Sequence, residues 1–507
     1  MRKYFIIILL VLSWPAAVFG IEFSPSTLVS GEVTSHNFYP DMVVTDSGKI
    51  YIVWVNTQGG GDVHFTMSND HGQTFTNFST VNSIPNHVVT IGFSGPQVEV
   101  LNDTIHVLWS DQRNGYDHSS AFYARSIDQG LTWDETQIGY PNGVNFYPEL
   151  LMDSQGILHA SFHYFQSGSL VYQHMAHTFS SDGGDTWSDF NIVSDYEPGE
   201  PCDCCPIELH ELPDGKIMNG FRNNENDIRD MFSMDWRPED STWINLSPMS
   251  YDGFYVTYCP TSGPSLVSQD STVAMAYMSE VNGEGRIFLT LSDDLGDTFA
   301  VKITMEMASG GNFYQNHPSA VMTQDGNIHV IWEDSRNDGN ILYSVLESGH
   351  SFMSGFSTVN DSITSSQEIA PQLASDSENY LYAVWVDRRS GRHIRFSTTF
   401  PLDLSIDEEK IPASFSLSQP YPNPFNSTTT IRFSVETRHG FRAESRNAVS
   451  LRIFDINGRL VDTLIDGFVN MGIHEIQWNA SKQPNGIYFI SLQVQGHTKT
   501  VKSIYLK

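Results

Sequence analysis

A short sequence box recurs along the chain at nearly constant spacing. Four copies match Ser-x-Asp-x-Gly-x-Thr followed by an aromatic residue, at residues 68–75, 126–133, 180–187 and 292–299. Degenerate copies lie near residues 235–243 and 347–352. The acidic markers of the six copies lie roughly 55 residues apart, and a regular period of this length indicates a repeat fold.

A second repeated element precedes each box. It consists of a proline, an apolar stretch, a turn rich in Asp and Gly, and alternating apolar residues that end on an aromatic side chain. The prolines are Pro40, Pro96, Pro148, Pro206, Pro264, Pro318 and Pro371, and the aromatic residues are Trp54, Trp109, Phe162, Phe221, Tyr277, Trp332 and Trp385. The pattern of these seven units is that of four strands each, with the fourth strand of the last unit supplied from elsewhere. The sequence therefore predicts an all-β fold, a β-propeller with seven four-stranded blades over residues 21–404. Six blades are the alternative.

The seventh unit ends after its third strand, at residues 393–400, and has no box or fourth strand. The N-terminal segment 21–33 resembles the segments that follow the boxes. We therefore expect it to complete the last blade, which would close the ring and cover a sheet edge.

The boxes themselves favour a structural role. Glycine permits the positive backbone φ of a tight turn, and Asp, Ser and Thr side chains bond the backbone of that turn. The residues assigned to this role are Asp70, Asp128, Asp182 and Asp294.

The charge distribution divides the chain into two domains. The sequence holds 59 acidic and 27 basic residues, a net charge of -32. Residues 21–414 carry 15 basic against 53 acidic side chains (net -38), and residues 415–507 carry 10 against 6 (net +4). Nucleic-acid binding is excluded as a function, because it needs many cations against the phosphate backbone. We expect a linker at 405–414 and a second, small β-sandwich domain at 415–507.

The first 20 residues predict a signal peptide. Arg2 and Lys3 precede a short apolar run that ends in small residues near Gly20. The run is too short to span a bilayer, and no later segment predicts a transmembrane helix. An exported protein with oxidisable cysteines is expected.

The boxes and their spacing resemble the Asp-box, or BNR, repeats of sialidases and sialidase-like propellers. In that family an arginine triad binds the carboxylate of sialic acid, a Tyr paired with a Glu is the nucleophile, and an Asp is the acid and base. The arginine motif of the first blade is missing here, where the sequence reads Asn37-Phe38-Tyr39-Pro40. This difference favours a propeller that binds glycans or surface proteins over an enzyme of the exo-sialidase type acting on acidic glycans.

Residues 415–507 resemble the C-terminal sorting domain of type IX secretion. The resemblance rests on residues 421–426 (YPNPFN), 449–459 (VSLRIFDINGR) and 484–489 (PNGIYF), and on the closing residues 499–507. It implies that the type IX export machinery recognises this domain. The protein is then secreted or located at the cell surface.

Acidic and basic residues follow the second strand of several blades. The candidate acids or bases are Asp111, Asp334 and Asp387, and the candidate ligand-binding arginines are Arg113, Arg222, Arg336 and Arg389. An arginine fork suits a carboxylate or sulfate on a sugar, and a nearby Asp suits proton transfer. The alternative is an Asp-Arg pair inside each loop that recurs because the blade recurs.

Aromatic residues in the loops between blades are further candidates. Tyr39 and Tyr147 are candidate catalytic residues, and Tyr258 and Tyr314 are similarly placed. These rings suit stacking on sugars, and packing around the channel is the alternative.

All four cysteines lie in two loops of adjacent blades, as Cys202, Cys204, Cys205 and Cys259. Two disulfides are the expectation for an exported protein. The alternative is a thiolate site for copper or zinc, with His163 or His210 as a further ligand, and hence a metal-dependent or redox enzyme. No metal is assigned from the sequence, and calcium among the acidic loops is left open.

Overall fold

The computed structural model describes residues 21–31, 36–168, 171–193, 199–239, 241–281, 283–305, 313–336, 339–361, 367–401, 415–435, 446–456, 459–470, 472–494 and 497–507. The chain divides into two compact units, with the division between Leu402 and Asp403. The predicted signal peptide and the predicted linker at 405–414 lie outside the described residues.

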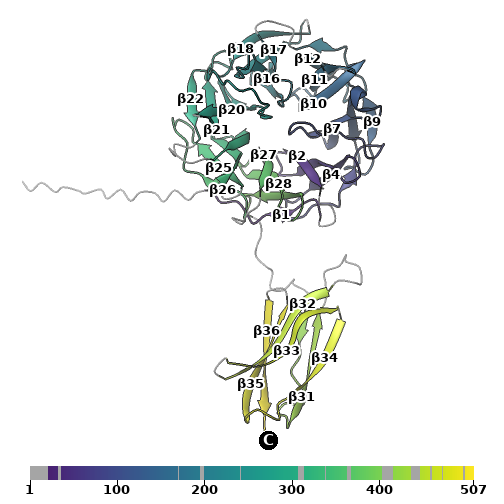
Figure 1. Ribbon diagram of the computed structural model, residues 1–507, viewed down its shortest axis with the longest axis vertical. Coiled ribbons are helices and arrows are strands. Elements are labelled where there is room, and N and C mark those ends of the chain that lie inside the picture. The colour runs from purple at the N-terminus through teal and green to yellow at the C-terminus, as the bar shows by residue number, and fades with distance from the viewer. Residues whose placement is uncertain are drawn as a thin grey trace, which may run out of the picture. The chain divides into compact units, whose positions relative to one another are not determined.

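The first unit is a ring of sheets (Figure 1). Its described residues form seven sheets, of which six have four strands and one has five. The first three sheets hold β2 (Asn37–Val44), β3 (Ile50–Asn56), β4 (Asp62–Ser68) and β5 (Ser79–Thr80); β6 (Gln97–Leu101), β7 (Thr104–Asp111), β8 (Ser120–Ser126) and β9 (Asp134–Gln137); and β10 (Gly143–Met152), β11 (Leu158–Gln166), β12 (Tyr172–Ser180) and β13 (Asn191–Ile192). A short 3-10 helix, η1 (Tyr116–His118), lies between β7 and β8.

The remaining sheets follow in chain order. The fourth holds β14 (Glu200–Pro201), β15 (Glu208–Glu211), β16 (Ile217–Asn224), β17 (Met231–Arg237) and β18 (Thr242–Pro248). The other three hold β19 (Ser265–Gln269), β20 (Thr272–Val281), β21 (Glu284–Ser292) and β22 (Val301–Thr304); β23 (Gln315–Met322), β24 (Ile328–Asp334), β25 (Asn340–Leu346) and β26 (Ser357–Thr358); and β27 (Glu368–Ser375), β28 (Leu381–Asp387), β29 (His393–Thr398) and β1 (Thr27–Leu28).

The N-terminal strand closes the ring, as the sequence predicts. β1 pairs antiparallel with β29, so that Thr27 faces Phe396 and Leu28 faces Arg395. The N–H of Val29 extends this ladder by donating to the carbonyl of Ile394 at 2.9 Å. The outer edge of β29 is thereby paired, which removes a site for aggregation.

The core of the ring lies between neighbouring sheets. Aromatic residues of the second strands are fully buried there, Trp54, Trp109, Trp332 and Trp385 among them. The alternating pattern places one face of each sheet against the preceding sheet and the other against the following one, which explains why both faces of these strands are apolar.

The boxes form turns that join neighbouring sheets. In the first box, Asp70 accepts hydrogen bonds from the N–H and the hydroxyl of Thr74, and Ser68 accepts one from the N–H of Gly72. A side chain at Gly72 would collide with Phe396 of the preceding sheet. The other three full boxes repeat these bonds around Asp128, Asp182 and Asp294.

Polar side chains connect the innermost strands around the channel. The carboxylate of Asp41 on β2 accepts a hydrogen bond from the N–H of Val98 on β6 at 2.8 Å, and Glu208 on β15 accepts one from Leu266 on β19 at 2.9 Å. Each innermost strand has one edge without a strand partner, and these side chains satisfy N–H groups that would otherwise be unpaired there.

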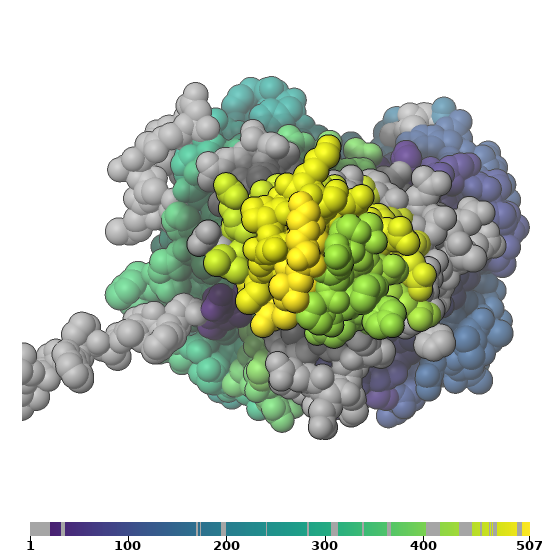
Figure 2. All heavy atoms as spheres, turned by 90° about the horizontal axis from the view of Figure 1, so that it is seen from below, coloured from purple at the N-terminus to yellow at the C-terminus, as the bar shows by residue number. Residues whose placement is uncertain are grey.

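The second unit is a small β-sandwich. One sheet holds β30 (Phe415–Leu417), β31 (Thr428–Val435) and β34 (Gly472–Asn479), and the other holds β32 (Arg446–Asp455), β33 (Leu460–Asn470), β35 (Gly486–Val494) and β36 (His497–Tyr505). The last strand of the chain lies beside the early part of this unit (Figure 2). The N–H of Phe425 donates to the carbonyl of Ile504, and the N–H of Leu506 donates to the carbonyl of Phe425.

Throughout the part of the chain described by the structure, no helix has the length and apolar character needed to cross a membrane.

Candidate functional site

The mouth of the central channel contains residues that immediately precede the repeated prolines. Tyr39, Tyr147, His317 and Ala370 each stand immediately before such a proline and have positive φ angles of 46°, 54°, 45° and 51°. In all four sheets the register of the innermost strand shifts at this position, which marks a β-bulge. Bulges redirect side chains, and non-glycine residues in the left-handed region often mark functional sites.

A cavity of about 350 Å³ follows the channel inward from these bulges. Its lining includes Phe93, Tyr147 and His317 near the bulges and Glu99 and Glu208 along the innermost strands. A cavity of this size, with aromatic and polar groups together, is typical of a site for a small ligand or for the end of a polymer.

Three rings from different parts of the chain meet at the mouth. Phe93 lies in the segment between the first and second sheets, and its ring stacks on His317 of the sixth sheet with centroids 3.8 Å apart. The ring of Tyr39 lies 5.3 Å from that of Phe93. These separations are those of packed aromatic pairs, so the three rings form one continuous group. We call Tyr39, Phe93 and His317 the mouth rings.

Glu333 fixes two of the bulges. Its Oε1 atom accepts a hydrogen bond from the N–H of Ala370 at 2.6 Å and lies 2.9 Å from Nδ1 of His317. The other ring nitrogen of His317, Nε2, lies 3.1 Å from the carbonyl oxygen of Thr261. The imidazole of His317 is therefore held between Glu333 of its own sheet and the segment that precedes the fifth sheet.

Arg392 supplies a cation beside the mouth rings. Its guanidinium lies over the ring of Phe38, 4.2 Å from the centroid. Burial raises the pKa of Tyr39, and the nearby charge of Arg392 opposes this shift. Within the described ranges Arg392 forms no ion pair, and its buried Nε atom has no hydrogen-bond acceptor. A guanidinium without an ion pair suits an anionic ligand at the mouth.

The four arginines predicted to bind ligand are held by other protein groups. Arg113 forms two hydrogen bonds to Asp111, at 2.9 and 2.8 Å, and one to Glu135 at 2.5 Å. Arg336 forms the same fork with Asp334, at 2.8 and 2.7 Å, whereas Nε and Nη2 of Arg389 both donate to Oδ2 of Asp387, at 2.8 and 2.5 Å. This arrangement is the pairing inside each loop that was the alternative.

Arg222, the fourth predicted arginine, is buried. Its guanidinium donates to the carbonyl oxygens of Ser262 at 3.1 Å, Arg229 at 2.7 Å and Met278 at 2.8 Å. Only 1% of the residue is exposed. Its bonds join the fourth sheet to the fifth sheet and to the linker between them, which is a structural arrangement.

The three candidate acids or bases are the partners of those arginines. Asp111, Asp334 and Asp387 have side chains that are 0%, 1% and 2% exposed. They belong to three different sheets and each faces its own arginine, so the structure does not bring them together. The carboxylate pair of a glycosidase needs two groups within about 5–10 Å across one sugar.

The tyrosines of the loops divide into two groups. Tyr39 and Tyr147 both lie at the channel mouth, although Tyr147 is only 3% exposed and burial raises the pKa of its hydroxyl. Tyr258 donates its hydroxyl to the carboxylate of Glu280, and Tyr314 packs closely against Gly285, so both are near the strands of the fifth sheet.

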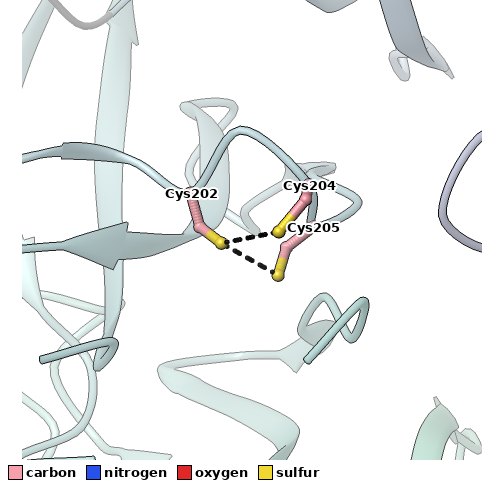
Figure 3. Close-up of side chains that lie close together, drawn as sticks. All are labelled: Cys202, Cys204 and Cys205. Carbon is pink, nitrogen blue, oxygen red and sulfur yellow. Dashed lines mark hydrogen bonds between the residues drawn. The ribbon is translucent and has the colours of Figure 1, made fainter. Parts of the chain in front are cut away.

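The cysteines converge where the innermost strand of the fourth sheet is split into β14 and β15. Cys204 and Cys259 form a disulfide, and Cys202 and Cys205 are free and buried. Figure 3 shows the sulfur of Cys202 directed toward those of Cys204 and Cys205, which lie 3.5 and 3.2 Å away. One of the two expected disulfides is thus present, and the other pair remains as thiols.

The sulfurs of Cys202, Cys204 and Cys205 lie within 4.8 Å of one another, as ligands of one metal ion would. Cys204 is bonded to Cys259, however, and only two thiols remain. His163 lies against the cluster through its Nε2 atom, 3.1 Å from the carbonyl oxygen of Cys205. His210 instead bonds the hydroxyl of Ser268 at 2.8 Å.

Phe93, His317, Glu333 and Arg392 were missed in the sequence. His317 carries a usable signal, because it occupies the same position before a proline as Tyr39 and Tyr147. Phe93 and Arg392 lie in irregular segments that the repeat does not align, and no sequence pattern relates them to the mouth.

The ring of repeated four-stranded sheets, joined by box turns and surrounding one channel, defines the class of repeat β-propellers. Residues 24–330 match the BNR repeat-like domain, and the chain belongs to that family. Residues 419–507 match the secretion system C-terminal sorting domain, so the protein is secreted or located at the cell surface through type IX secretion.

Solved structures are similar to the chain at low sequence identity. A polysaccharide lyase of family PL25, an ulvan lyase bound to -[GlcA(1-4)Rha3S]-, is 11% identical, with 73% of this chain and 95% of that chain covered and a TM-score of 0.54. The α-L-arabinanase of Penicillium chrysogenum complexed with arabinobiose is 15% identical, with coverage of 74% and 98% and a TM-score of 0.44. A mutant of the NanB sialidase of Streptococcus pneumoniae is 11% identical, with coverage of 73% and 70% and a TM-score of 0.42. A comparison with curated protein sequences finds no match.

Proposed function

We propose that this secreted propeller binds an acidic polysaccharide at the mouth of its channel, without cleaving it. The observation that carries the proposal is the meeting of the mouth rings with the unpaired guanidinium of Arg392. Aromatic faces stack on sugar rings, and a guanidinium binds a carboxylate or a sulfate with paired hydrogen bonds.

The carboxyl groups of the channel and the charge of Arg392 limit how the ligand is oriented. Asp41, Glu99, Glu149 and Glu208 line the channel below the mouth. Burial raises the pKa of Glu99 and Glu208 to about 8, so these groups are largely protonated at neutral pH and suit uncharged sugar oxygens, whereas the charge of Arg392 attracts an anionic group. The acidic group of the sugar therefore stays at the mouth, and an uncharged part of the ligand enters the cavity.

The likeness to the ulvan lyase supports this class of ligand. That enzyme shares the fold and is bound to a saccharide of glucuronic acid and sulfated rhamnose. Binding without cleavage is favoured here because the three candidate acids, Asp111, Asp334 and Asp387, are all engaged by arginines away from the mouth rings.

Binding is tested with the full mature chain and a panel of polysaccharides that are neutral, carboxylated or sulfated, by isothermal titration calorimetry. We expect the acidic members to bind and the neutral ones to bind more weakly. Arg392→Gln should weaken binding of acidic members at least about tenfold, since a charge-assisted pair is worth roughly 1.5–3 kcal/mol. Arg237→Gln is the matched control, because Arg237 is a partly exposed arginine that lies beside Glu239.

The aromatic contribution is tested in the same experiment with Tyr39→Ala, and Tyr251→Ala serves as its control because Tyr251 is 73% exposed. Equal affinities of the Arg392→Gln variant and the unchanged protein for every polysaccharide would refute the proposal. Release of new reducing or unsaturated ends from any member would show that the site is catalytic, and would overturn the absence of cleavage.

A further inference from the structure

A buried thiol lies in contact with a disulfide beside the channel mouth. The disulfide between Cys204 and Cys259 joins the segment between β14 and β15 to the segment before β19. The Cys202 sulfur is 3.5 Å from the Cys204 sulfur and 3.2 Å from that of Cys205 (Figure 3). Cys202 therefore contacts both a sulfur that it can attack and a second thiol that can attack it in turn.

The surroundings of Cys202 stabilise a thiolate. Nη1 of Arg229 lies 3.0 Å from its sulfur and 3.7 Å from that of Cys204. A hydrogen bond with the Cys205 thiol lowers the pKa of Cys202 to about 7 despite its burial, and Arg229 adds to the effect. Burial instead raises the pKa of Cys205. Since the thiolate is the reactive form, Cys202 is the nucleophile of the pair.

The same surroundings disfavour a metal ion. The guanidinium of Arg229 occupies the side of the Cys202 sulfur and would repel a cation bound there. Cys204, which a three-thiolate site would need, is bonded to Cys259. The partly buried cation and the existing disulfide are both compatible with thiol chemistry.

We propose that these four cysteines form a thiol–disulfide exchange centre. The Cys202 thiolate attacks the Cys204 sulfur, the bond between Cys204 and Cys259 breaks, and Cys259 leaves as a thiolate that takes a proton from water. Cys205 then attacks the Cys202 sulfur and passes its proton to the departing Cys204 sulfur. One disulfide and two free cysteines exist before and after, so no external oxidant or reductant is needed.

The exchange would produce a reactive thiol at the protein surface. Cys259 is exposed, whereas Cys202 and Cys205 are buried. When Cys259 is released as a thiol, the protein can form a mixed disulfide with another secreted protein or with a small disulfide. This release also opens the covalent link between two segments next to the mouth, where Gly92 packs against both the carbonyl of Cys204 and the hydroxyl of Tyr147. This inference does not rest on polysaccharide binding.

The test traps free thiols in the folded, unreduced full chain with iodoacetamide and locates them by peptide mass spectrometry. We expect Cys259 to be alkylated with time while a disulfide appears between Cys202 and Cys205. In Cys202→Ser the alkylation of Cys259 should be at least about tenfold slower, because the attacking thiolate is gone. In Cys205→Ser, the matched control, the exchange should stop at a Cys202–Cys204 disulfide and Cys259 should still be alkylated.

Arg229→Gln provides a test that leaves all four cysteines in place, should a cysteine variant fail to fold. The alkylation of Cys259 should then require a higher pH, because the thiolate of Cys202 loses its neighbouring cation. Unmodified Cys259 in the folded wild-type protein, or equal alkylation rates in wild type and Cys202→Ser, would overturn the proposal. Four free thiols together with bound copper or zinc would also overturn it, in favour of a metal site.

Discussion

The imidazole of His317 stacks on the phenyl ring of Phe93, with ring centroids 3.8 Å apart. His317 belongs to the sixth sheet and Phe93 to the segment that joins the first sheet to the second, so the seventh and the first sheets separate their positions around the ring. The contact therefore spans the mouth of the channel. It attaches the irregular segment that contains Phe93 to the sixth sheet.

Replacement of Phe93 by Ala should loosen this segment. An aromatic pair contributes about 0.5–1.5 kcal/mol beyond the burial of its surface. We expect faster proteolysis within residues 84–95 and a small decrease in the free energy of unfolding, measured by limited digestion and by urea unfolding. Phe352→Ala, which removes a ring that is 69% exposed, should change neither property. Equal digestion rates for both variants would show that the contact between Phe93 and His317 does not hold this segment in place.

The channel carboxylates should make the protein less stable as the pH rises. Burial raises the pKa of Glu99 and of Glu208 to about 8. Their unfolded values are about 4.3, so the folded protein binds more protons between pH 4.3 and 8, and stability falls as pH rises through this range. Glu208→Gln retains an acceptor for the N–H of Leu266. It should be more stable than wild type at pH 8, by on the order of 1–3 kcal/mol, and similar at pH 4.5.

The control for the pH dependence is Glu239→Gln, because the Glu239 side chain is 69% exposed. Thermal unfolding of all three proteins between pH 4.5 and 8 provides the measurement. Parallel pH profiles for wild type and Glu208→Gln would show that this carboxylate ionises normally in the channel.

Arg222 should be one of the most sensitive positions of the ring. Arg222→Met keeps much of the volume but leaves three carbonyl oxygens without their donor. Hydrogen bonds to charged groups contribute about 1.5–3 kcal/mol each, so we expect a loss of several kcal/mol in urea unfolding. Arg237→Met, at a partly exposed position, should cost less than about 1 kcal/mol. A loss of similar size in both would mean that the buried bonds contribute little.

Closure of the ring depends on a single short strand. Val29→Pro removes the N–H that donates to Ile394, whereas Val29→Ala shortens the side chain and keeps that N–H. The proline variant should be the less stable of the two by about 1 kcal/mol or more, and it should aggregate faster on heating because the edge of β29 is opened. Differential scanning calorimetry and light scattering measure the two effects, and identical behaviour would mean that β1 does not secure the edge.

Removal of residues 415–507 should abolish export. The sorting domain has a core of its own, in which Ile431, Leu451 and Trp478 are buried, so its deletion leaves the propeller core complete. We expect the shortened protein to be folded and retained inside the cells, as measured by fractionation, immunoblotting and circular dichroism. Its appearance in the medium at the normal level would show that export does not need the domain.

The repeat made much of the fold predictable. The regular boxes, the prolines and the buried second-strand aromatics such as Trp54 and Trp385 follow local rules of turns and alternating strands, which act over a few residues. The pairing of β1 with β29 was predictable because the seventh unit visibly lacked a strand. The division of the innermost strand of the fourth sheet into β14 and β15 was not predicted. The repeat there has its proline, Pro206, at the usual position, so the sequence pattern gives no sign of the division.

The candidate site was predicted less well. The sequence indicated Tyr39, Tyr147 and the convergence of the cysteines, all of which belong to repeat positions or to two recognisable loops. It also indicated Arg113, Arg336 and Arg389, and left open whether they face a ligand or an aspartate. A side chain's partner depends on its direction and on its neighbours, and the spacing of residues along the chain contains neither.

By itself the sequence determined the two domains, the ring of repeated sheets, the closure of that ring and the C-terminal sorting domain. Each of these follows from periodicity, charge or a linear motif. Only the tertiary structure decided which arginine remains unpaired beside the channel, which rings meet across its mouth and which cysteines are bonded. These relationships join residues from different sheets, and the distances between such residues are set only when the ring closes.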